Sequence, residues 1–75
     1  MPEWAVLSSE EVGRILERNG FAVARQRGSH VIYQRRLDGG TRTVPVPRAR
    51  EIAIGTLRSI CRQSGLPPAL FQRES

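Results

Sequence analysis

Residues 8–20 carry apolar side chains at the spacing of an amphipathic helix. These side chains recur three or four positions apart, at Val12, Ile15 and Leu16. Ser8 stands three residues before Glu11, a spacing at which the two residues can cap the first helical turn reciprocally. Asn19-Gly20 follows, and glycine readily adopts the left-handed backbone conformation that commonly ends an α-helix. The pattern therefore predicts a first helix with one narrow apolar stripe.

The period then changes from that of a helix to the two-residue period of β-strands. Three strands are predicted, over residues 21–26, 30–36 and 41–46. The links between them are Arg27-Gly28-Ser29 and Asp38-Gly39-Gly40, and such short turns join neighbouring antiparallel strands. Pro45 and Pro47 cannot donate to a hydrogen-bond ladder, so we expect the third strand to lie at an edge or to end early.

Side-chain parity assigns faces to two of these strands and leaves the middle one open. The apolar pairs expected to share a face are Phe21 with Val23, and Val44 with Val46. In the middle strand, Ile32 points inward, or else Val31 and Tyr33 form the core pair. His30 shares a face with Ile32, so its direction depends on this choice. The open polar face is expected to carry Gln26, Gln34, Arg36, Thr41 and Thr43.

A second helix is predicted from a start between Arg50 and Gly55 to a stop at Gly65. Its expected apolar face consists of Ile54, Leu57, Ile60 and Cys61, with Cys61 as a small core residue. Leu66, Leu70 and Phe71 are expected to fold back over the core as a tail. The sequence thus predicts one α+β domain over residues 1–75, in which an α-β-β-β-α chain places both helices on one face of a three-stranded antiparallel sheet.

Composition narrows the function classes. The 75 residues include one cysteine and one histidine, which excludes an internal disulfide and a Cys/His metal cluster, so we expect neither cofactor nor metal. No membrane-length apolar stretch or secretory leader is apparent, which favours a cytoplasmic protein without membrane contact. All twelve basic residues are arginine, and the net charge of +5 favours contact with nucleic acid. An acidic protein partner is also compatible with this charge, and a codon-driven preference explains the choice of arginine over lysine but not the positive sign of the charge.

Four sequence pieces, in order and at their spacing, resemble the HicA toxins over nearly the whole chain. They are Gly20-Phe21, Arg27-Gly28-Ser29-His30, Val44-Pro45-Val46 and Gly55-Thr56-Leu57-Arg58-Ser59-Ile60 with Gln63 and Gly65. The resemblance implies a fold like that of double-stranded-RNA-binding domains (dsRBD-like). It also implies an endoribonuclease that cleaves mRNA as the toxin of a toxin-antitoxin system and is neutralised by a HicB-like antitoxin.

By this resemblance His30 is the catalytic residue, and Gly28 and Ser29 shape the turn that presents it. The candidate RNA-binding arginines are Arg25, Arg27, Arg35, Arg36, Arg42 and Arg48. Many family members carry a further histidine or lysines after the third strand, whereas this chain reads Pro45-Val46-Pro47-Arg48-Ala49-Arg50. A two-histidine mechanism within one chain is therefore excluded.

One imidazole suffices for metal-independent cleavage in which the RNA 2′-hydroxyl is the internal nucleophile. Imidazoles exchange protons near neutral pH, and arginines can stabilise the charged phosphorane. Three other interpretations stay open. A lone histidine at a strand start is commonly only a turn or edge residue. The chain is also compatible with a non-catalytic dsRBD-like RNA-binding module, or with an interaction subunit whose basic surface meets an acidic protein.

Overall fold

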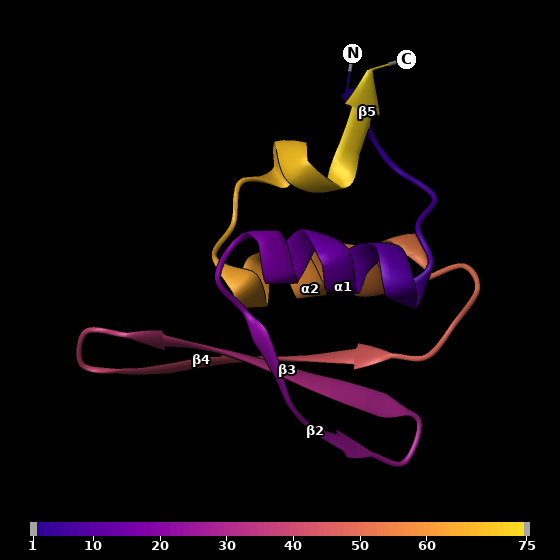
Figure 1. Cartoon of the computed structure of the whole chain (residues 1–75). Helices are drawn as coiled ribbons and strands as arrows, with labels where there is room; N and C mark the ends of the chain where they lie inside the picture. The colour runs from indigo at the N-terminus through magenta and orange to yellow at the C-terminus, as the bar shows by residue number, and fades with distance from the viewer. Residues whose placement is uncertain (1, 75) are drawn as a thin grey trace.

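Two helices cover one face of a three-stranded antiparallel sheet in the computed structural model, which describes residues 2–74 (Figure 1). The main elements are α1 (Ser9–Arg18), β2 (Ala22–Arg27), β3 (His30–Leu37), β4 (Gly40–Pro47) and α2 (Ile54–Ser64). The terminal elements are β1 (Pro2–Trp4), a 3₁₀ helix (Pro68–Phe71) and β5 (Gln72–Glu74). The predicted α+β class, the α-β-β-β-α order and the shared helix-bearing face are confirmed.

The capping residues predicted for α1 hold its first turn. The backbone N–H of Glu11 donates to Ser8 Oγ at 3.1 Å, and the backbone N–H of Ser8 donates to Glu11 Oε1 at 2.9 Å. This second hydrogen bond is the main reason that the pKa of Glu11 lies below its usual value. Gly20, with φ of 93°, turns the chain out of the helix in the left-handed region. The sequence pattern therefore located both ends of α1.

β3 is the central strand of the sheet, in the order β2-β3-β4. Its pairing with β4 runs without interruption from His30 opposite Pro47 to Leu37 opposite Gly40. Its pairing with β2 contains an irregularity between Val23 and Arg25, where β2 carries an extra residue. β4 is an edge strand, as its two prolines predict.

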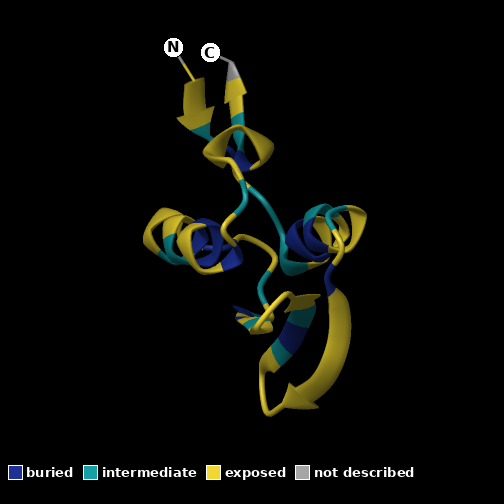
Figure 2. Cartoon of the chain, turned by 90° about the vertical axis from the view of Figure 1, so that its left-hand side faces the viewer, coloured by how far each residue is buried: buried dark blue, intermediate teal, exposed yellow. Residues whose placement is uncertain are grey.

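The core lies between the helices and the sheet, where burial is concentrated (Figure 2). Its buried members are Val12, Leu16, Phe21, Tyr33, Val44, Val46, Ile52, Leu57, Ile60, Cys61 and Phe71. Tyr33 therefore faces the helices, and Val31 is partly buried on the same side. Of the two alternatives for β3, Val31 and Tyr33 are thus the core pair, and Ile32 points to the other face. Gly13 of α1 leaves the room that the Tyr33 hydroxyl occupies.

Three apolar side chains of the predicted elements are exposed, and the face predicted for Gln26 is wrong. Val23 is 51% exposed, although it shares the side of Phe21, because it lies on an edge strand at the bulge. Ile54 is 40% exposed at the first position of α2, before the helix reaches the core, and Leu70 in the tail is equally exposed. Gln26 pairs with Val31 and so lies on the helix-facing side, not on the open face.

Near the two chain ends, β1 and β5 pair as a two-stranded antiparallel sheet beyond the helices, which the hydrophobic pattern did not predict (Figure 1). The Arg58 guanidinium of α2 lies over the Trp4 ring, 5.9 Å from its centroid, at a distance typical of a cation–π contact. Among the described residues, no helix has the length and apolar character needed to cross a membrane.

Candidate active site at the β2-β3 turn

The turn between β2 and β3 presents His30 and is fastened to the end of β4. Gly28 has φ of 56°, a left-handed conformation that glycine adopts without strain. The carbonyl of Ser29 accepts a hydrogen bond of 2.7 Å from the backbone N–H of Arg48, which follows β4 directly. The turn is therefore anchored on both sides, by the β2-β3 ladder and by the chain leaving β4.

His30 lies on the face of the sheet that the helices leave open. Successive side chains of a strand point to opposite faces, and Val31, the next residue, faces the helices. His30 therefore points the other way, on the same side as Ile32, which is buried but does not belong to the main core cluster. Its direct cross-strand partners are Arg27 on β2 and Pro47 on β4. The His30 side chain is exposed to solvent, so a polymer can reach the imidazole without any rearrangement of the core.

Three of the six candidate arginines gather around this turn. Arg27 pairs directly with His30, and Arg25 pairs with Ile32, so that both arginines share the open face with His30. Arg48 follows β4 beside the turn, but its side chain lies on the helix-facing side, where Nη2 donates to Gln26 Oε1 at 3.0 Å. Sequence reasoning did not include Gln26 in the site, because its hydrogen bond with Arg48, which follows β4, becomes visible only in the folded chain.

The other three arginines lie at the far end of the hairpin. The strand from His30 to Arg36 spans roughly 20 Å at the rise of an extended chain. Arg42 donates from Nη1 to the Gln63 carbonyl at 3.1 Å, near the end of α2, and Arg35 packs against Gly20 after α1. Arg35 and Arg42 thus stabilise the ends of the helices, and these three arginines do not belong to the cluster around His30.

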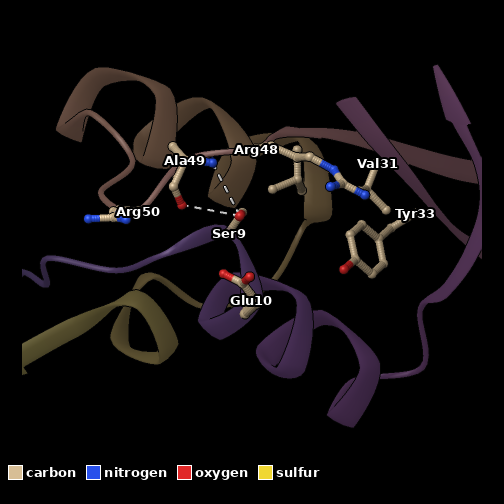
Figure 3. Close-up of a pocket in the computed structure, with 8 residues that line it drawn as sticks. Ser9, Glu10, Val31, Tyr33, Arg48, Ala49 and Arg50 are labelled. Atoms are coloured by element: carbon tan, nitrogen blue, oxygen red, sulfur yellow. Dashed lines mark hydrogen bonds between the residues drawn. The ribbon is translucent and has the colours of Figure 1, made fainter. Parts of the chain in front are cut away.

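A cavity of about 450 Å³ lies on the helix side of the sheet and does not include His30 (Figure 3). Its wall consists of Ser9, Glu10, Val31, Tyr33, Val46, Arg48, Ala49 and Arg50. Ser9 Oγ is already occupied, since it donates to the Ala49 carbonyl at 3.1 Å and accepts from the Ala49 N–H at 3.2 Å. The carboxylate of Glu10 opposes the binding of phosphate there. This cavity, with one carboxylate among the guanidinium groups of Arg48 and Arg50, is therefore a poorer fit to RNA than the open face, because β2 and β3 carry no carboxylate.

Two buried titratable side chains belong to the core rather than to the site. Burial raises the pKa of Tyr33, with smaller contributions from the carboxylates of Glu17 and Glu10. Burial also raises the pKa of the Cys61 thiol, which keeps it protonated and unreactive, as expected for a small core residue. Within residues 2–74, no three histidine, cysteine or carboxylate side chains are grouped as metal ligands.

Comparison with known proteins identifies the family of the chain. The family model described as HicA toxin of bacterial toxin-antitoxin matches residues 9–66. This range runs from the start of α1 past the end of α2, and it includes the β2-β3 turn and His30. No curated protein matches the chain. The extent of the family match shows that the chain belongs to the HicA toxins of bacterial toxin-antitoxin systems.

Proposed function

We propose that this toxin is an endoribonuclease in which His30 transfers a proton during cleavage of mRNA. The observation that carries the proposal is the register of β2 and β3, which pairs His30 with Arg27 on the exposed, helix-free face. A general acid-base group transfers the protons of RNA cleavage through the 2′-hydroxyl, and a neighbouring cation can stabilise the charge that develops on the phosphate.

In the proposed step, the 2′-oxygen attacks the adjacent phosphorus and the bond from phosphorus to the 5′-oxygen breaks. The His30 imidazole accepts the proton of the 2′-hydroxyl, and the leaving 5′-oxygen takes up a proton from water or from the resulting imidazolium. The products are a 2′,3′-cyclic phosphate and a free 5′-hydroxyl. Proton transfer of this kind contributes typically 10²- to 10⁴-fold to a rate.

Arg27 and Arg25 are the residues proposed to stabilise the extra negative charge of the phosphorane. Guanidinium groups donate paired hydrogen bonds to phosphate oxygens, and such charge-assisted bonds are about twice as strong as neutral ones. Both side chains share the face of His30. Arg48 is proposed to bind the RNA backbone at the turn, and Gly28 and Ser29 to hold His30 in position. No step in this scheme uses a metal or cofactor.

The partners proposed for this toxin are mRNA and a HicB-like antitoxin that neutralises it. Membership in a toxin-antitoxin family supports an inhibitory protein partner. The net charge of +5 supports binding to a polyanion. The fold order and the basic surface also favour a second function, an RNA-binding module without catalysis.

Induction of the wild-type and His30→Ala proteins in cells separates these two functions. The proposal predicts growth arrest and fragmented messages with the wild-type protein, and neither with the variant at equal expression. Arrest with intact messages in both cases would instead identify a non-catalytic binder. A purified RNA with a single 2′-deoxy substitution at the cleaved position tests the nucleophile, because it must resist cleavage there while it still binds.

A further inference from the structure

β2 forms an open edge of the sheet. It pairs with β3 on one side only, and all six of its residues are exposed. An edge strand presents backbone N–H and C=O groups along its outer side, and these can pair with one more strand. This edge begins where the chain leaves Phe21 and ends at the turn that presents His30.

The opposite edge of the same sheet is blocked. β4 contains Pro45 and ends at Pro47, and neither residue has a backbone N–H to donate. β2 contains no proline; its protection consists of a bulge and of two arginines, Arg25 and Arg27. Bulges and charges are two devices that keep edge strands from self-association. A proline blocks pairing with any strand, whereas a positively charged edge repels only strands that are themselves positively charged.

Charge therefore decides which strand can approach β2. No carboxylate occurs from Phe21 to Leu37, and the whole chain carries +5. A second copy would bring its own arginine-bearing edge against this one, at a cost of about 1 kcal/mol for each close pair of like charges even in water. An acidic strand gains the same amount from each close pair. Nucleic acid has no backbone that can continue a β-ladder.

We propose that β2 binds an extended, acidic segment of a protein partner, which adds to the sheet as a fourth strand. The exposed Val23 side chain offers this segment one apolar contact. Because the chain belongs to a toxin-antitoxin family, the proposed partner is the antitoxin. The added strand would lie beside Arg25 and Arg27 and neutralise them. Inhibition by this route rests on the proposed ribonuclease function, whereas the strand pairing does not.

The first test uses a ten-residue peptide that alternates glutamate and valine, with calorimetry and hydrogen exchange as readouts. The peptide is expected to bind and to slow amide exchange in β2. The same peptide with every backbone amide N-methylated keeps its charges but cannot donate hydrogen bonds, and its affinity is expected to fall at least tenfold. Equal affinity of the two peptides, or protection confined to β4, would overturn the proposal.

The second test places one carboxylate on the edge or away from it. Val23→Asp and Leu37→Asp both replace an exposed apolar residue and lower the net charge equally, but Leu37 lies at the far end of β3. We expect Val23→Asp to weaken peptide binding about tenfold and Leu37→Asp less than twofold; equal effects would contradict strand pairing at β2. His30→Ala is expected to bind the peptide like the wild type, so a failure of the ribonuclease proposal is distinguishable.

Discussion

Removal of the Arg27 side chain should slow RNA cleavage strongly, whereas removal of Arg36 should not. Arg27 and Arg36 have the same charge, are both exposed and lie on the same face of the sheet. They differ in position, because Arg27 pairs directly with His30 while Arg36 lies roughly 20 Å along the strand. A comparison of Arg27→Ala with Arg36→Ala therefore separates the effect of proximity to His30 from the effect of net charge.

The expected magnitudes follow from these positions. A hydrogen bond to a charged group contributes about 1.5–3 kcal/mol, so Arg27→Ala should lower kcat/KM roughly 10- to 150-fold. At roughly 20 Å in water, two unit charges interact by about 0.2 kcal/mol before salt is considered. Screening at physiological ionic strength, with a Debye length of about 8 Å, removes most of that energy. Arg36→Ala should therefore change kcat/KM less than about twofold.

The assay is single-turnover cleavage of a short fluorescent RNA by the two variants, with circular dichroism as a check on folding. Measurement at two salt concentrations separates bulk attraction from a local contact, because bulk attraction weakens with salt. Equal losses in the two variants would refute the localisation of phosphate binding to the β2-β3 turn. A larger loss with Arg36→Ala would move the site to the other end of the hairpin.

Three further predictions concern the scaffold. Gly13→Ala should destabilise the fold by about 1–2 kcal/mol in urea unfolding, since its methyl group would overlap the Tyr33 hydroxyl, while the double variant with Tyr33→Phe should recover most of the loss. The pKa of Glu11 is lower in the folded chain than its unfolded value near 4.5, so the ionised carboxylate stabilises the fold at pH values above 4.5. This stability is lost as the pH falls through the lowered pKa. Glu11→Gln should therefore flatten the acid limb of a thermal unfolding series; an unchanged limb would contradict this. Gly65→Ala, at φ of 71° and against the Arg42 side chain, should lower the unfolding midpoint, and an unchanged midpoint would exclude strain there.

Local signals in the sequence were sufficient for the ends of α1 and for the turns of the sheet. The Ser8 and Glu11 pair and the Asn19-Gly20 exit act within a few residues, so both can be predicted without knowledge of the tertiary contacts. The position of β4 at an edge followed in the same way, from the chemistry of proline.

Side-chain directions in the sheet depended on the register, which the sequence left open. Ile32 and Tyr33 are equally suitable core residues by composition, and only the pairing with β4 places Tyr33 against the helices. The bulge after Val23 has no signal in an alternating run, and it changes which residues of β2 share a face. The division of the arginines into a cluster at His30 and a distant group follows from the same register.

The most direct test of the central claim is the single-turnover rate of RNA cleavage by purified wild-type and His30→Ala proteins, with analysis of the product ends. The proposal predicts a loss of roughly 10²- to 10⁴-fold in the variant. It also predicts 2′,3′-cyclic phosphate ends in the wild-type products. A folded His30→Ala protein that cleaves RNA at the wild-type rate would contradict the assignment of His30 as the proton-transfer residue.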